Sequence, residues 1–125
     1  ALLLLLLSSS AWAITCVAAT PGVFTCDYDE PIKNADAAGT FLDDLAFTNM
    51  FFQVGASTPV KSANITASSV KGGGHVTTPI TVPAVQGQRI TVTFWATATD
   101  LSANESVKSN QVVKTVDLLP PLPPS

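Results

Sequence analysis

The sequence predicts an all-β protein, a sandwich or barrel of short antiparallel strands, and three observations support this. Apolar and polar residues alternate with a period of two, turn residues separate the alternating stretches, and only 12% of the 125 residues are charged. A period of two places successive side chains on opposite faces of a strand. Short strands separated by Gly, Pro, Asn and Ser are typical of sandwiches and barrels.

The chain opens with the features of an export signal. Six leucines at residues 2–7 are followed by three serines and then by Ala11, Trp12 and Ala13. Because signal peptidase requires small side chains at positions −3 and −1, we expect a signal peptide at residues 1–13, cleaved after Ala13. The apolar run is shorter than the ~20 residues of a membrane span, which disfavours an anchor. We therefore expect a secreted, periplasmic or cell-surface protein.

The two cysteines of the chain lie soon after the expected signal peptide. Cys16 and Cys26 are ten residues apart, with the turn signal Pro21-Gly22 midway between them. A hairpin folded there would bring them opposite one another, so a disulfide bond is expected in an oxidising compartment. Closing so short a loop contributes about 2–3 kcal/mol by chain entropy. The alternative is two buried thiols that act as small hydrophobic residues.

Further strands are expected along the rest of the chain, at residues 23–28, 48–54, 60–66, 76–82, 89–100 and 106–116. Residues 89–100 alternate most clearly, with apolar side chains on one face and threonines with Trp95 on the other. This pattern predicts one buried face and one face in water.

Two stretches do not fit the strand pattern. Residues 35–45 are expected to be a long loop with at most one helical turn, because Gly39 interrupts them and they are too short for an independent helix. Residues 118–125 contain four prolines among the last six, so the folded domain should occupy residues 14–117 and be followed by an extended Pro-rich tail or linker.

Three sequence motifs occur in the order of a known family. The run from Ala98 to Asn110 resembles the A-x-D-x-x-G-N-E-S-x-x-S-N pattern that joins strands F and G of bacterial fibronectin type III domains. Residues 33–55 resemble the B–C loop and strand C of the same domains, and residues 28–31 resemble the end of strand B. The resemblance implies a seven-stranded antiparallel β-sandwich of the immunoglobulin-like class. The chain departs from the pattern at Ala103, where the family usually has a turn glycine, and at Tyr28, where it usually has a core tryptophan.

The residue inventory argues against catalysis. The chain has one histidine, His75, which follows three glycines and is expected in a loop. No nucleophile–base pair, paired carboxylates or metal-ligand cluster can be assembled, so we expect no enzyme activity, no cofactor and no metal site. A calcium site is the alternative interpretation of the acidic residues between positions 27 and 44, but they lack D-x-D-x-D-G spacing and read equally well as a solvated loop. A net charge of −3 gives no footprint for nucleic acid.

The expected function is therefore that of an interaction module or spacer. An exposed Trp95 and the F–G turn at Ser102, Ala103 and Asn104 are the expected contacts for a protein partner or a surface glycan. Burial of Trp95 under neighbouring side chains is the alternative. The second candidate function is a carbohydrate-binding accessory module in which Trp95 stacks on a sugar. Self-association through open strand edges is also expected to be possible, because Lys61 and His75 are the only charged or titratable side chains near two candidate edges.

Overall fold

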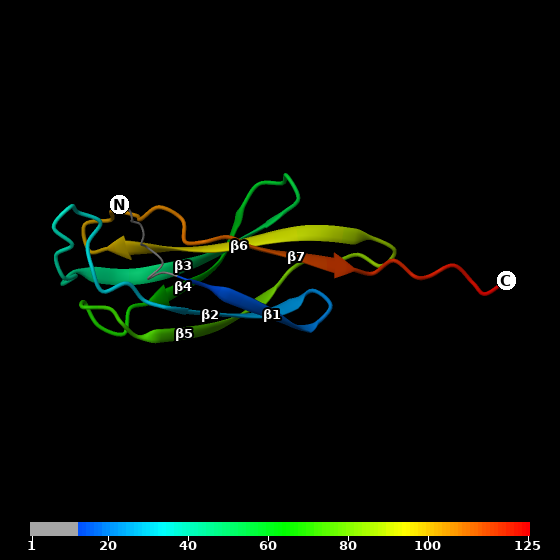
Figure 1. The fold of residues 1–125 in the computed structure, drawn as a ribbon, viewed down its shortest axis with the longest axis horizontal. Helices are drawn as coiled ribbons and strands as arrows, with labels where there is room; N and C mark the ends of the chain where they lie inside the picture. The colour runs from blue at the N-terminus through cyan, green and yellow to red at the C-terminus, as the bar shows by residue number, and fades with distance from the viewer. Residues whose placement is uncertain (1–12) are drawn as a thin grey trace, which may run out of the picture.

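The computed structural model describes residues 13–125, which form seven strands in two antiparallel sheets and so confirm the predicted β-sandwich (Figure 1). The first sheet has the order β1-β2-β5 and contains β1 (Thr15–Thr20), β2 (Val23–Asp29) and β5 (His75–Thr81). The second has the order β4-β3-β6-β7 and contains β3 (Leu45–Val54), β4 (Val60–Thr66), β6 (Arg89–Asp100) and β7 (Val112–Asp117).

The segments outside the strands confirm some of the sequence-based expectations and correct others. Residues 35–44 form a loop without a helical turn, and His75 is the first residue of β5 rather than a loop residue. The expected signal peptide lies outside the described residues except for Ala13. Within residues 13–125, no helix has the length and apolar character needed to cross a membrane.

The β1–β2 hairpin carries the predicted disulfide bond. Cys16 lies directly opposite Cys26 in the ladder, and their sulfur atoms are 2.13 Å apart. Gly22 supplies the positive φ of 85° that the turn requires, a conformation that costs glycine little. Both cysteines are buried in the core, so the bond ties an edge strand to the centre of its sheet.

The core lies between the two sheets and takes its large side chains from both. Phe24 of β2 packs on Phe94 of β6 with ring centroids 4.8 Å apart. Tyr28 of β2 shares a 2.6 Å hydrogen bond with the Thr48 hydroxyl of β3, which joins the sheets through a buried polar contact. Because Tyr28 is buried in the core and its hydroxyl is satisfied, it fills the expected core position while avoiding the cost of an unpaired polar group.

The predicted wet face of β6 is wrong over half its length. Alternation holds on the inner face, where Val92, Phe94 and Ala96 are fully buried. On the outer face, however, Trp95, Thr97 and Thr99 are buried as well. The physical reason is that β6 is a central strand, and side chains from β3 and from residues 105–108 cover it.

The last strand begins later than predicted, at Val112 instead of residue 106. Ser106 and Ser109 each bond β6 twice: their backbone N–H groups donate to the carbonyls of Ala98 and Ala96, and their hydroxyls accept from the N–H groups of the same two residues. Three residues of this segment thus span two residues of β6. That spacing cannot continue a regular ladder, so the segment is hydrogen-bonded without being a strand.

Candidate functional site

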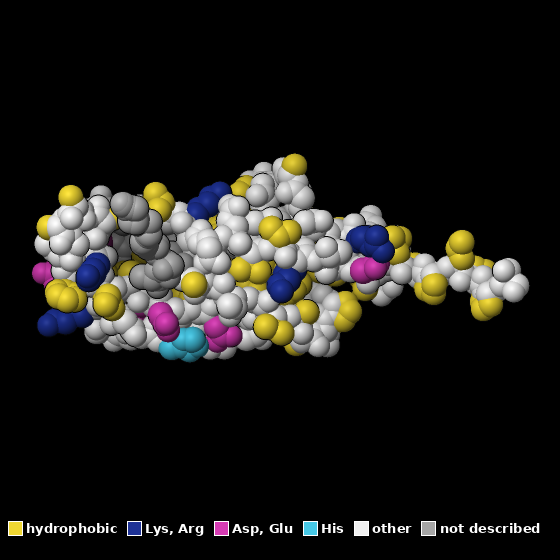
Figure 2. Space-filling model, in the orientation of Figure 1, with side chains coloured by type: hydrophobic (Ala, Val, Ile, Leu, Met, Phe, Trp, Pro, Cys, Tyr) yellow, Lys and Arg dark blue, Asp and Glu magenta, His cyan; other side chains and the backbone are white. Residues whose placement is uncertain are grey.

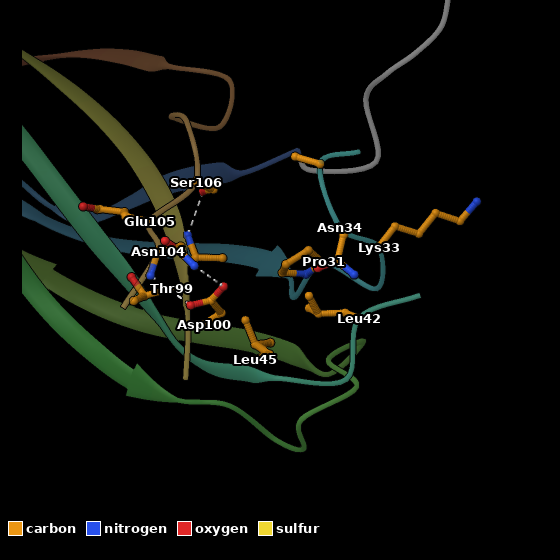
Figure 3. A pocket seen from close by; sticks show the side chains of 12 residues that line it. Pro31, Lys33, Asn34, Leu42, Leu45, Thr99, Asp100, Asn104, Glu105 and Ser106 are labelled. Carbon is orange, nitrogen blue, oxygen red and sulfur yellow. Dashed lines mark hydrogen bonds between the residues drawn. The ribbon is translucent and has the colours of Figure 1, made fainter. Parts of the chain in front are cut away.

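One end of the sandwich, here called the tip, is formed by the β2–β3 loop at residues 30–44 and the β6–β7 turn at residues 101–106. Between them lies a cavity of about 290 Å³ (Figure 3). Its lining combines apolar side chains with polar side chains of the loop and the turn: Pro31, Lys33, Asn34, Ala35, Leu42, Leu45, Ala98, Thr99, Asp100, Asn104, Glu105 and Ser106. The structure therefore brings the predicted F–G turn residue Asn104 to a cavity that sequence reasoning did not locate.

Short-range contacts hold the β2–β3 loop in shape. Asp36 accepts hydrogen bonds from the N–H and the hydroxyl of Thr40, at 2.9 and 2.6 Å, and Asn34 donates to the same hydroxyl. These bonds, mainly the one from the Thr40 hydroxyl, lower the pKa of Asp36. A single bridge then pairs Lys33 with Phe41, so the loop folds as a small hairpin. Leu42 and Leu45 emerge from it into a minor apolar cluster with Ala98, separate from the main core.

Asp100 organises the β6–β7 turn. One of its carboxylate oxygens accepts from the N–H groups of Ser102 and Asn104, both at 2.9 Å, and the other accepts from the Asn104 amide at 3.1 Å. The Asn104 N–H and the other donors favour the charged form, which lowers the pKa of Asp100. The predicted turn residues are thus held by a side chain that also lines the cavity.

Ala103 is strained in this turn, and its replacement should stabilise the protein. Its φ is 67°, in the left-handed region that costs a non-glycine residue about 1–2 kcal/mol. We expect Ala103→Gly to raise the free energy of unfolding by about 0.5–1 kcal/mol, once the extra freedom of glycine in the unfolded chain is subtracted. Urea denaturation of the two chains measures this, and equal or lower stability of the variant would contradict it.

Large apolar side chains are exposed on the same loop and turn that form the cavity, next in sequence to residues that line it. Phe41 is 73% exposed and Leu101 66%, and Ile32 is exposed as well. Their neighbours place them together at the tip: Leu42 N–H bonds to the Ile32 carbonyl, and Leu101 N–H bonds to the Asp44 carbonyl. Single exposed apolar residues are common, but a group beside an apolar cavity is typical of an interaction site.

Trp95 lies elsewhere, on the outer face of the second sheet, and is only 3% exposed. Its ring stacks on Phe51 of β3 with centroids 5.6 Å apart, and the Lys108 ammonium lies 4.2 Å from its centroid. Lys61 of β4 lies over Phe51 in the same way, so cation and ring contacts cross three strands. Of the two interpretations of Trp95, burial is therefore the one that the structure has, because Lys108 covers the surface that a ligand would need. Stacking on a sugar would require that side chain to leave.

The acidic residues that suggested calcium are spread over separate roles. Asp27 and Asp29 flank His75 on the outer face of the first sheet, at 3.2 and 2.9 Å from its two ring nitrogens. Figure 2 shows the histidine between acidic side chains on the surface. In the described part of the chain, no group of three or more His, Cys, Asp or Glu residues is placed to hold a metal ion.

Opposite pKa shifts predict that stability is greatest in mildly acidic solution. Hydrogen bonds from Asp29 and Asp27 raise the pKa of His75, so its contribution is present below about pH 6.5 and is lost as the pH rises through the higher folded value. Hydrogen bonds lower the pKa of four carboxyl groups, whose contributions are present above about pH 3.9 and are lost as the pH falls: Asp27, Asp36, Asp100 and Asp117. We expect the melting temperature to peak between these limits. His75→Gln should remove the decline on the alkaline side, and an unchanged decline would contradict the assignment.

Two residues have structural roles that were not predicted from the sequence. Glu30 is buried and accepts hydrogen bonds from the N–H groups of Ser68 and Gly74, both at 2.9 Å. It thereby fixes the glycine loop, residues 67–74, behind Pro31 and Leu45 of the cavity wall. The only sequence signal was an acidic residue beside Pro31, at the end of a strand.

The second is Asn110, the last residue of the F–G motif. Its amide oxygen accepts from the Ile14 N–H at 2.7 Å, and its amide nitrogen donates to the Ile14 carbonyl at 3.2 Å. Ile14 directly precedes β1 in the first sheet, whereas Asn110 follows the segment bonded to β6 in the second. The motif asparagine thus connects the two sheets at one edge.

Comparisons of the chain with protein-family profiles, curated proteins and solved structures found no match. The strand order and the tip geometry are therefore the observations from which function is inferred.

Proposed function

We propose that the chain is an exported, non-catalytic interaction module of the fibronectin type III kind, and that it binds a protein partner through the tip. The observation that carries this proposal is the apolar-floored cavity between the β2–β3 loop and the β6–β7 turn, with exposed Phe41 and Leu101 beside it. In immunoglobulin-like sandwiches the loops at one end of the sheets form recognition surfaces on a rigid scaffold.

The strand order supports the family resemblance. The first, second and fifth strands form one sheet, and the third, sixth and seventh form the centre and one edge of the other. This is the arrangement of strands A, B, E and C, F, G in immunoglobulin-like sandwiches, with the fourth strand placed beside the third. The residues of the F–G motif also have structural roles in this chain. Asp100 accepts the hydrogen bonds that form the turn, and the segment after the turn is held by Ser106, Ser109 and Asn110.

Two features support export. The Cys16–Cys26 disulfide bond is stable in an oxidising compartment. Ile14 belongs to the core whereas Ala13 is exposed, so cleavage after Ala13 would leave Ile14 with the folded domain. A protein-binding role is favoured over the carbohydrate alternative because a cavity of about 290 Å³ lies at the lower end of the size of ligand pockets and is floored by aliphatic side chains.

The test is to capture partners on the immobilised protein from a surface extract of cells that produce it. We expect the double variant Phe41→Ser/Leu101→Ser to lose the captured protein, because both side chains are exposed and their replacement leaves the core intact. Val113→Ser, which removes an exposed apolar side chain from β7, is the matched control and should keep it. Equal capture by all three chains would refute the tip as the contact surface.

The carbohydrate alternative is tested separately. Trp95 is the single tryptophan in the chain cleaved after Ala13 and in the Trp12→Phe variant of the uncleaved chain. Polysaccharide titration should leave its fluorescence unchanged because Lys108 covers the ring. A saturable change would favour the carbohydrate-binding function over the proposed one.

A further inference from the structure

We propose that the tip cavity takes the Pro-rich segment 118–125 of a second copy of this chain, so that the molecules associate head to tail. This inference rests on the proposed function and names the chemistry of the partner. It follows from three observations: the character of the segment, the character of the cavity, and the distance between them along one molecule.

The segment is apolar, stiff and extended. Leu118 is still bonded to Gly87 and Gln88, and the segment leaves the domain after it, at the end of the sandwich opposite the tip (Figure 1); Leu122 is 91% exposed. Proline fixes φ and favours polyproline II, which has three residues per turn. Leu119 and Leu122, three residues apart, therefore lie on the same side of the segment, about 9 Å from one another.

The cavity has the size and lining for such side chains. Its floor is formed by Pro31, Leu42, Leu45 and Ala98, and its volume of about 290 Å³ suits one or two aliphatic groups. A polyproline II segment leaves its carbonyl groups unpaired, and the Asn104 amide at the cavity gives one N–H to Asp100 and has a second N–H to donate. Binding would cost little conformational entropy because the prolines already restrict the segment.

A molecule cannot fill its own cavity in this way. Asp117, where the segment begins, pairs with Arg89 at the start of β6, whereas the cavity is lined by Ala98 and Asp100 at the far end of that strand. These positions are separated by about 30–36 Å along the strand. Eight residues of polyproline II span only about 25 Å, so the segment must reach a neighbouring molecule.

Charge favours the same arrangement over a symmetric pairing of two tips. The tip carries Glu30, Asp36, Asp43, Asp44 and Glu105 against Lys33, and Asp100 adjoins it, so two tips repel each other. Residues 118–125 contain no charged side chain and meet no such repulsion. Because the two contacting surfaces differ and lie at opposite ends, the contact does not close on itself and produces linear assemblies.

The test compares sedimentation of the full chain with that of Leu122→Ser over a series of concentrations. We expect the wild-type chain to form elongated species whose mass rises with concentration. The association constant of the variant should be lower by about tenfold or more, because the variant loses the burial of one leucine side chain. The fold should be unaffected because this position is exposed. Val113→Ser, exposed on β7, should behave as the wild type.

A peptide of residues 117–125 provides the second measurement. Added to the Leu122→Ser chain, it should shift amide resonances of residues 31–45 and 98–106 and leave those of β4 unchanged. A wild-type chain that stays monomeric, with no shift caused by the peptide, would overturn the head-to-tail contact. Association that is equal in wild type and Leu122→Ser would also overturn it and would indicate pairing of strand edges. Loss of extract capture in the Phe41→Ser/Leu101→Ser chain would in either case still support the proposed function.

Discussion

Gly72→Ala is expected to destabilise the protein by about 3–5 kcal/mol, a large part of the stability of a domain of this size. A methyl group on Gly72 would lie 1.9 Å from the Pro31 carbonyl oxygen and 3.1 Å from its carbon. Both are backbone atoms of a loop that Glu30 holds in place, so neither can move aside freely. The φ of +69° adds the cost of a left-handed conformation.

Gly55→Ala is the matched control for this experiment. Gly55 also has a positive φ, +53°, but a methyl group there would meet nothing within 4 Å. We therefore expect Gly55→Ala to lower the free energy of unfolding only by the cost of the left-handed backbone conformation, about 1–2 kcal/mol. Urea unfolding of the two variants separates close contact from backbone strain, and equal losses would show that the glycine loop does not press on Pro31.

Glu30→Ala is expected to cost about 2–3 kcal/mol, because it leaves the N–H groups of Ser68 and Gly74 without their acceptor at a partly buried site. The lost stability should come from these hydrogen bonds and not from a change in surface charge, since Glu30 is only 4% exposed. Hydrogen exchange should report the effect locally, with faster exchange at residues 68–74 than in β6.

Glu30→Gln distinguishes the hydrogen bonds from mere occupation of space. The amide keeps one oxygen as an acceptor but places an NH₂ group against one of the donors, so an intermediate loss of about 1–2 kcal/mol is expected. If both the Gln and the Ala variant were as stable as the wild type, the Glu30 carboxylate would not be the group that holds the glycine loop in place.

The strands were predictable where a local period of two decides the structure. The bounds expected for residues 60–66 and 89–100 are those of β4 and β6. Phe51 and Phe52, adjacent in β3, point to opposite faces as their spacing requires, with Phe52 in the core and Phe51 against Trp95. The disulfide bond was likewise predictable, because a turn signal and ten residues of separation place the two cysteines in one hairpin.

The tip and the outer face of β6 were not predictable, because their contacts join residues far apart in the sequence. Glu30 finds its partners 38 and 44 residues later, at Ser68 and Gly74. Trp95 is covered by Lys108, which reaches it only because the segment after β6 runs back along that strand. The period of two shows which face a side chain occupies, but it does not show what lies over that face.

The three-for-two spacing at Ser106 and Ser109 has a consequence for aggregation. An exposed sheet edge with regularly spaced N–H and C=O groups is a template for another strand. Beside Ala96 and Ala98 the serine segment covers the edge of β6, and its own outward groups do not repeat at the interval that an incoming strand needs. The part of β6 beside Ala96 and Ala98 is therefore protected from pairing with another strand without the use of a charged residue. The chain has few charged residues that could protect an edge, since only 12% of its residues are charged.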